Sequence, residues 1–252
     1  MPKITSNGLK IIAIVVMILD HFAYYYRELI PFEVYMGFRI VGRMAMPIFA
    51  FLLIQGYWHT KDVKKYMIRL LVLAILTQIC ITGIGWIGLY FVPEYVTSVV
   101  WELNIVFSLC LSLCVLCMID ERKRIHSSIT LDVGIRCIVI FAIFAMYRIL
   151  PIDYGIWAPL LIVGMYGIER IIKPKSQLLY WVMLAIMVFI TLSFSSSIGG
   201  WAILAVPFLL LYNGKLGRRS PFIQKLYYVI FPLQHFVLFS TSLVWYFFTK
   251  MN

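Results

Sequence analysis

The first long apolar segment of the chain carries an acid and an imidazole close to its end. Asp20 and His21 follow a nearly unbroken apolar run that begins at Gly8. An ionisable residue near the centre of a bilayer costs about 2.5 kcal/mol or more, so such residues are candidates for function. His21 is the candidate general base, and its alternative role is a neutral imidazole paired with another helix. Asp20 joins it as the second candidate catalytic residue, although it points about 100° away around the helix.

Lys10 lies eleven residues before His21 on nearly the same helical face. The rise between them is about 16 Å, so they cannot touch, but one long ligand can reach both. This spacing suits a co-substrate with anionic phosphates at one end and a reactive group at the other. Acyl-coenzyme A has this form, and Lys10 becomes a candidate cofactor-binding residue. The alternative for Lys10 is a lysine that extends its amine to the membrane interface.

Arg39 and Arg43 lie one helical turn apart at the head of the next apolar segment. Arginine stays charged, so within a membrane it needs an anion, carbonyl groups or water. Two interpretations are open. Either both residues pair structurally with Asp20 or Glu28, or they form an anion site that holds part of a cofactor or substrate.

Four further polar residues lie at the ends or in the middle of apolar segments. Asn104 lies at the head of one segment, Asp153 and Tyr154 lie at the head of another, and His235 lies mid-segment after Pro232. We predict that they contact the substrate. Asp153 could instead cap a helix, and His235 could either partner the His21 site or make a packing hydrogen bond.

A basic turn late in the chain is the remaining candidate for cofactor binding. Asn213, Gly214 and Lys215 open this turn, and Gly217 lies in it. Glycines let backbone N–H groups approach a phosphate closely. A basic turn can equally well serve only to set membrane orientation.

The elements that position these residues are membrane spans. The chain of 252 residues is 63% hydrophobic and only 13% charged, whereas soluble domains carry about 25% charged residues. The prediction is an all-α, polytopic integral membrane helix bundle that forms a single domain over residues 1–252. A span needs about 20 residues. Nine candidates are residues 8–26, 38–57, 66–85, 103–119, 134–150, 154–171, 178–195, 198–212 and 222–248, and residues 86–102 form a possible tenth, interfacial element.

Basic residues gather in alternate loops, after the second, fourth, sixth and eighth segments. The positive-inside rule therefore places the N-terminus in the cytoplasm. The net charge of +11 thus reports topology and gives no reason to expect nucleic-acid binding. The bases concerned are Lys61, Lys64, Lys65, Arg122, Lys123, Arg124, Arg170, Lys173, Lys175, Lys215, Arg218, Arg219 and Lys225.

Five cysteines lie inside apolar segments, and three of them share one helical face: Cys110, Cys114 and Cys117. A metal cluster there would need charged thiolates in hydrocarbon without histidine or carboxylate partners. We interpret them as small packing residues, and we expect no metal and no disulfide framework.

The ordered series of motifs resembles the TraX family, membrane proteins related to conjugative pilin acetylases. The likeness covers nearly the whole chain, and Lys10 stands where larger relatives have arginine. The matching stretches are residues 9–13, 20–21, 39–49, 104–107, 153–155, 212–217 and 231–235.

The resemblance implies an acyltransferase in a bacterial-type cell membrane that uses acetyl-coenzyme A from the cytoplasm. Its acceptor would be a peptide N-terminus, a glycan hydroxyl or a lipid, and its immediate surroundings are the lipid bilayer. Two alternatives remain open: a non-enzymatic transporter for a small anion, and a membrane partner in a secretion or conjugation assembly.

Overall fold

The structure is a computed structural model that describes residues 3–93, 101–120, 125–217 and 221–251. Helices account for nearly all the regular structure in these ranges, and β-type pairing there is limited to two isolated bridges. The loop bases predicted at 122–124 and 218–219 lie outside the described residues. The predicted all-α membrane bundle is confirmed. In chain order the elements are α1 (Ser6–Tyr25), α2 (Phe32–Gly42), α3 (Ala45–His59), α4 (Val63–Phe91), α5 (Ile105–Ile119), α6 (Ile129–Ile149), α7 (Trp157–Ile171), α8 (Gln177–Ser193), the 3-10 helix η1 (Gly199–Ala205), α9 (Val206–Leu210) and α10 (Pro221–Met251).

Five helical stretches of the described chain are long and apolar enough to cross a membrane. They are Ser6–Tyr25, Phe32–His59, Val63–Phe91, Ile129–Ile149 and Leu226–Thr249. Shorter apolar helices accompany them at Ile105–Ile119, Gln177–Ser193 and Gly199–Leu210. These lengths fit a polytopic membrane protein that combines long and short apolar helices.

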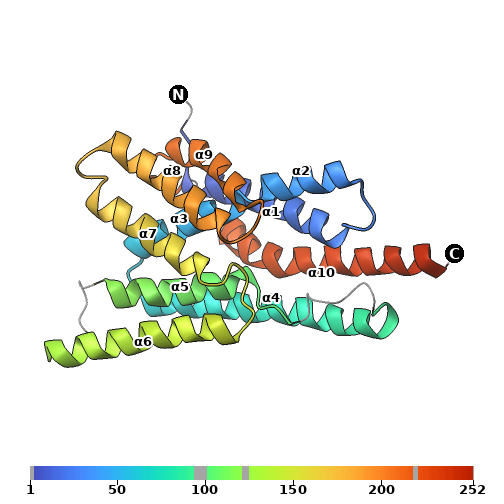
Figure 1. Ribbon diagram of the computed structural model, residues 1–252, viewed down its shortest axis with the longest axis horizontal. Helices are drawn as coiled ribbons and strands as arrows, with labels where there is room; N and C mark the ends of the chain where they lie inside the picture. Colours follow the sequence, from blue (N-terminus) through green and yellow to red (C-terminus); the bar gives the residue numbers. More distant parts are fainter. Residues whose placement is uncertain (1–2, 94–100, 121–124, 218–220, 252) are drawn as a thin grey trace.

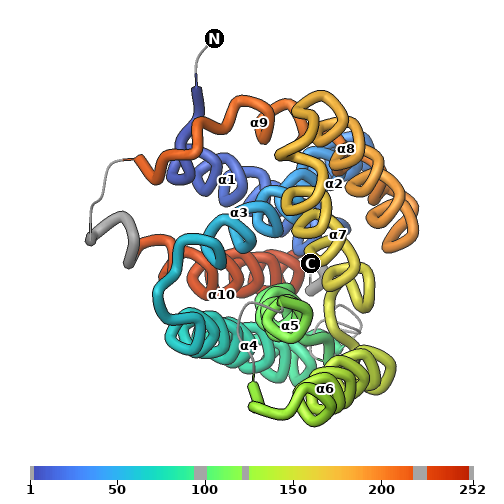
Figure 2. The backbone as a smooth tube through the Cα atoms, turned by 90° about the vertical axis from the view of Figure 1, so that its left-hand side faces the viewer, coloured from blue at the N-terminus to red at the C-terminus, as the bar shows by residue number. Residues whose placement is uncertain are grey.

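The helices form a bundle with two sides. α4, α5 and α6 lie along one side, and α1, α2, α3, α8 and α9 lie along the other (Figures 1 and 2). α10 packs against α4 and also contacts α1, while α7 links α5 to α8. The α3–α4 and α7–α8 connections lie at one end of the bundle, and the α1–α2 connection lies at the opposite end (Figure 1). This is the arrangement that alternating basic loops predict.

The apolar residues divide between a packed interior and a lipid-facing exterior. Ile48, Phe51 and Leu113 are completely or almost completely buried in the main core. In contrast, only 17% of the residues in the most apolar stretch of α6 are buried, and Phe141 on this helix is 76% exposed. Exposed apolar surface on this scale is typical of a membrane-facing helix.

The second apolar segment differs from the single helix predicted at 38–57. Helix begins at Phe32, ends at Gly42 and restarts at Ala45. Pro47 explains the interruption, because proline has no N–H for the carbonyl of Arg43 and its ring crowds that carbonyl. The N–H groups of Arg43 and Met44 donate instead to carbonyls three residues back, each at 3.2 Å.

Two further predictions on element boundaries were wrong. Residues 86–91 are not part of a separate interfacial element but continue α4, which meets no proline before Pro93. The segment predicted as a helix over 198–212 is mostly a 3-10 helix followed by five residues of α-helix. Paired glycines at its start and Pro207 near its middle weaken regular helical bonding there.

Candidate functional site

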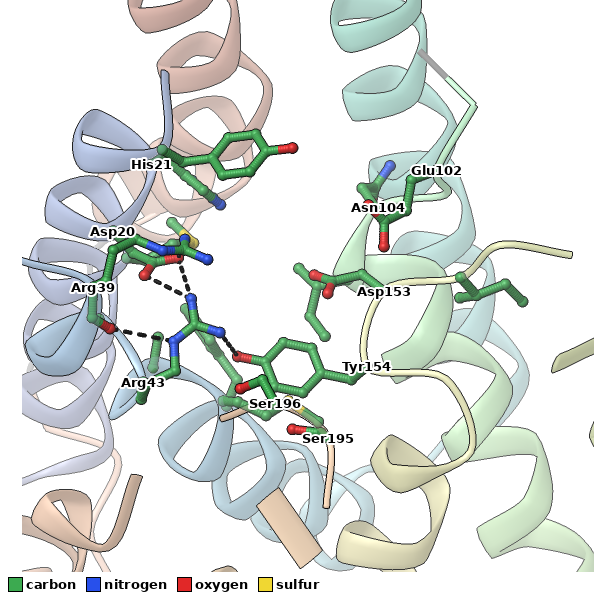
Figure 3. Close-up of a pocket in the computed structure, with 18 of the residues that line it drawn as sticks. Asp20, His21, Arg39, Arg43, Glu102, Asn104, Asp153, Tyr154, Ser195 and Ser196 are labelled. Atoms are coloured by element: carbon green, nitrogen blue, oxygen red, sulfur yellow. Dashed lines mark hydrogen bonds and ion pairs between the residues drawn. The ribbon is translucent and has the colours of Figure 1, made fainter. Parts of the chain in front are cut away.

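A cavity of about 490 Å³ lies between the two sides of the bundle and gathers most of the predicted site residues. Asp20, His21, Arg39 and Arg43 line one wall, and the opposite wall holds Asn104 and the segment 152–155 (Figure 3). His235 of α10 also lines it. We call this space the His21 cavity.

Asp20 binds both arginines of the second segment. Its carboxylate accepts hydrogen bonds from Arg39 Nη1 at 2.7 Å and from Arg43 Nη2 at 2.6 and 2.7 Å (Figure 3). Arg43 Nε also donates to the carbonyl of Arg39 at 3.2 Å. The structural pairing is therefore present, with Asp20 rather than Glu28 as the partner. One carboxylate and two guanidinium groups leave a formal charge of +1 at the cavity wall.

Gly42 allows this triad to form, because it brings α2 directly against Asp20. A Cβ atom at position 42 would lie 2.3 Å from Asp20 Cβ and 2.5 Å from its Oδ1. The Asp20 carboxylate could not keep its position beside such a methyl group.

Gly42→Ala is therefore expected to destabilise the protein by about 1–3 kcal/mol, the usual cost of overpacking a tight interior. The measurement is the thermal unfolding midpoint in detergent. Gly37→Ala on the same helix is the matched control, since its Cβ would meet nothing within 4 Å. Equal midpoints for the two variants would contradict the close packing of α2 on Asp20.

Tyr154 reaches the triad from the opposite wall. Its hydroxyl lies 3.4 Å from Arg43 Nη1, at the long end of hydrogen bonding, and its φ of 61° is unusual for a residue with a side chain. Gly155 continues this left-handed turn with a φ of 49°. A strained turn of this kind is found where the surrounding structure fixes a side chain for use.

Asp153 lies in the same connection and lines the cavity. Its backbone pairs with Leu103, and its carbonyl accepts a hydrogen bond from the Ser108 hydroxyl. The alternative of a helix cap does not apply, because α7 begins after Ile156 without a side-chain cap. Burial raises the pKa of Asp153 to about 7, nearby Glu102 adds to this rise, and Arg43 opposes it.

His21 has a second imidazole as its neighbour. The ring centroids of His21 and His235 are 4.3 Å apart, and His235 Nδ1 is 2.8 Å from the Tyr25 hydroxyl. His235 is thus both a partner of His21 and a member of a packing hydrogen bond. The Nδ1 atom of His21 is buried and has no hydrogen bond of ordinary geometry among the described residues, although the Gln234 side chain lies close enough to interact with the ring.

Lys10 lies in a different space from His21. It lines a cavity of about 370 Å³, the Lys10 cavity, together with Thr60, Tyr66, Arg69 and Tyr227. The Lys10 amine lies 5.5 Å from the centre of the Tyr227 ring. Phe49 lines both the Lys10 cavity and the His21 cavity, so the two spaces adjoin.

Three predicted residues have local structural partners. Asn104 caps α5 by accepting from Val106 N at 3.0 Å, and its amide donates to Ala74 O and Gln78 Oε1. Asn104 still lines the His21 cavity. Asn213 and Lys215 line neither cavity, and Asn213 Oδ1 accepts from Lys215 N at 2.9 Å.

The basic turn instead accepts hydrogen bonds from the backbone at the start of α1. Ser6 N donates to Lys215 O at 2.9 Å, and Asn7 N donates to Leu216 O at 3.1 Å. These first-turn amides would otherwise be free to bind a phosphate.

Sequence reasoning missed several residues that line the His21 cavity. Tyr25 lies one turn after His21, so the i, i+4 spacing could have indicated a shared face. Glu102 lies two residues before Asn104, and nothing local marked it as part of a site. Ser195 and Ser196 reach the cavity from the connection after α8 (Figure 3), which sequence reasoning placed within or beside helical spans.

Comparison with known proteins gives one family and one curated relative. The family model described as the TraX protein matches residues 5–242. A probable fimbrial assembly protein FimC, serogroup H1, of Dichelobacter nodosus is 28% identical over 148 residues. This match covers 56% of the chain and 57% of the relative, so it spans little more than half of either protein. No solved structure matches the chain.

Proposed function

The chain belongs to the TraX family, and from this premise we propose that it is an integral membrane acyltransferase. It moves an acetyl group from acetyl-coenzyme A, bound on the Lys10 side, to an acceptor in the His21 cavity. The observation that carries the proposal is the pairing of these two spaces. One holds cations suited to phosphates, and the other holds an imidazole whose buried Nδ1 has no hydrogen-bond partner among the described residues.

His21 acts as the general base in this proposal. It takes the proton from the acceptor amine or hydroxyl as the acceptor attacks the thioester carbonyl. The new bond to the acetyl carbon forms, the carbon–sulfur bond breaks, and the departing thiolate receives the proton to give free coenzyme A. His235, with its ring centroid 4.3 Å away, forms part of the wall beside this base.

The positive groups have separate tasks. Lys10 and Arg69 line the same cavity and are suited to hold the phosphates of the donor. Arg39 and Arg43 keep a net positive charge after pairing with Asp20, which favours the oxyanion formed at the thioester carbonyl. Asn213 and Lys215 line neither cavity, so any contact that they make with the donor would lie outside both cavities.

The acceptor enters the His21 cavity between Asp153, Tyr154 and Asn104. A peptide N-terminus, a glycan hydroxyl and a lipid are the candidate acceptors. The name of the relative, a probable fimbrial assembly protein, supports a peptide of a pilus or fimbrial subunit as the acceptor. A cell membrane of bacterial type is the expected location.

Binding of labelled acetyl-coenzyme A to the purified protein in detergent tests the donor site. Lys10→Ala is expected to weaken binding about tenfold or more, since a hydrogen bond to a charged group contributes about 1.5–3 kcal/mol. Lys65→Ala is the matched control, because the Lys65 side chain is 81% exposed and does not line the Lys10 cavity. A folded wild-type protein that does not bind acetyl-coenzyme A would overturn the proposed function.

Asp153 makes the stability of the protein depend on pH. Its pKa of about 7 in the folded protein exceeds the ordinary value of 3.8, so between these values the folded state binds more protons than the unfolded state. The stabilisation is present at low pH and is lost as pH rises through 7. The unfolding midpoint of wild type is therefore expected to fall between pH 5 and 8 more steeply than that of Asp153→Asn.

The control for this profile is Asp62→Asn, at the exposed start of α4. A hydrogen bond from the Lys65 N–H helps to lower the pKa of Asp62, so this carboxyl does not titrate between pH 5 and 8. Its substitution should leave the slope of the profile unchanged. Parallel profiles for wild type and Asp153→Asn would argue against a raised pKa at Asp153.

The name of the relative also favours a second candidate function, that of a membrane partner in fimbrial assembly without catalysis. Under this alternative, His21→Ala would preserve assembly as long as the protein folds. A small-anion transporter is a third candidate, and it would move anions across liposomes independently of acyl-coenzyme A. The pairing of both arginines with Asp20 weighs against it, because the anion would have to compete with a bound carboxylate.

A further inference from the structure

The Lys10 cavity and the His21 cavity follow one another along the same helices. On α1 the lining passes from Lys10 and Ile14 to Met17 and His21. On α10 it passes from Tyr227, Tyr228 and Phe231 to His235. On α3 it passes from Leu52 and Leu53 back to Met46 and Ala45. The two cavities are therefore consecutive compartments of one path through the bundle.

Phe49 stands at the boundary on α3 and contributes to both walls. Its ring packs edge-on against Phe231, with 5.5 Å between ring centroids and 61° between planes. Phe231 is only 6% exposed and lines the Lys10 cavity alone, so its position is fixed by packing. Phe49 is only partly buried and faces open space on both sides, so its ring is the member of the pair that has room to move.

We propose that Phe49 is the partition between the two compartments, and that its ring must move for a donor bound at Lys10 to reach His21. This inference rests on the proposed function. The rise of about 16 Å from Lys10 to His21 passes the level of Phe49, so an extended donor arm has to cross this boundary.

A closed partition has two physical consequences. It keeps water in the His21 cavity from reaching the thioester of a donor bound in the Lys10 cavity. It also limits the width of the group that passes, because an aromatic ring blocks the path unless its side chain rotates. The size of residue 49 therefore sets two properties. One is the rate at which water hydrolyses the bound donor, and the other is the length of the acyl groups that the protein accepts.

Accessibility of the His21 cavity tests the partition without any donor. The five cysteines of the chain are replaced with alanine or serine, and Ser195→Cys places one thiol at the wall of the His21 cavity. A charged, membrane-impermeant thiol reagent is added to inverted vesicles, which present the Lys10 side. Lys65→Cys serves as the marker of this sidedness.

Phe49→Ala is expected to raise the labelling rate of Ser195→Cys about tenfold, as removal of a barrier of about 1.4 kcal/mol predicts. Phe49→Leu should give a smaller increase and serves if the alanine variant does not fold. Phe51→Leu is the matched control on the same helix, because Phe51 is 2% exposed and lines neither cavity. Equal labelling rates in all these proteins would overturn the partition.

Turnover gives the second readout. Phe49→Trp is expected to slow acetyl release about tenfold at saturating acetyl-coenzyme A, since the passage is narrowed. Phe49→Ala should hydrolyse acetyl-coenzyme A faster in the absence of an acceptor and should accept longer acyl groups. Normal turnover in Phe49→Trp would refute the partition and leave the proposed function intact. Absence of donor binding in wild type would refute the proposed function, and the labelling experiment would still decide on the partition.

Discussion

Replacing His21 with alanine is expected to lower acetyl transfer by about 10²–10⁴-fold, the usual contribution of a positioned general base. Its ring lies in the His21 cavity, and its buried Nδ1 has no partner among the described residues. His235, in contrast, is hydrogen-bonded to Tyr25. The measurement is the rate of acetyl release from labelled acetyl-coenzyme A at saturating donor.

Donor binding separates a chemical defect from a folding defect in this experiment. The His21→Ala protein should bind acetyl-coenzyme A with nearly wild-type affinity, because Lys10 and Arg69 lie in the other cavity. His59→Ala is the matched control, since His59 is exposed at the end of α3 and its Nδ1 lies 2.7 Å from Gln55 O of its own helix. Transfer within about twofold of wild type by a folded His21→Ala protein would remove His21 from its catalytic role.

The membrane fold was largely predictable, because long apolar segments in a weakly charged chain have few alternatives to transmembrane helices. The errors lie where a local residue changes backbone bonding. Pro47 interrupts the second segment at Arg43, and the glycines at 199 and 200 begin a 3-10 helix instead of a span. Pro47 was visible in the sequence, but hydrophobicity alone does not show where the unpaired carbonyl falls.

The pairings within the site were harder to predict than the residues that form it. The sequence indicated that Arg43 needs an anion, but it left Asp20, Glu28 and a bound ligand as alternatives. The choice depends on how α1 and α2 are rotated against each other, and Gly42 fixes that rotation through its contact with Asp20. The pairing of His21 with His235 joins residues at opposite ends of the chain, and no local pattern reports such a contact.

The basic turn shows a different limit of local reasoning. Asn213 and Gly214 correctly indicate a turn, and Gly214 adopts a φ of 75°. Nothing in the turn shows that its carbonyls will bind the first amides of α1. From the sequence alone this turn is compatible with a phosphate site, whereas in the folded protein its carbonyls accept hydrogen bonds from the first turn of α1.

Removing the Asp20 carboxylate is expected to have the largest effect on stability. Asp20→Ala should destabilise the protein by about 3–5 kcal/mol, because it leaves two guanidinium groups without a counter-charge in a low-dielectric interior. The side chains of Asp20 and Arg43 are only 12% and 10% exposed, so water cannot replace the lost partner. The measurement is the unfolding midpoint in detergent together with the yield of monodisperse protein.

A surface ion pair provides the matched control for Asp20. Glu28 bonds to Arg27 at 3.2 Å, but both side chains are more than half exposed. Glu28→Ala should therefore change stability by no more than about 1 kcal/mol. A similar small effect for Asp20→Ala would show that the triad is not a buried network.

Restoring charge balance separates the two tasks of the triad. In the double variant Asp20→Asn with Arg43→Gln, one fewer positive charge is left unpaired than in Asp20→Asn alone, so stability should recover in part. Acetyl transfer should stay low in this stabilised protein, because the positive charge facing the thioester oxyanion is diminished. Recovery of both stability and transfer would mean that Asp20 and Arg43 only hold α1 against α2, and the oxyanion role would then pass to other groups of the cavity.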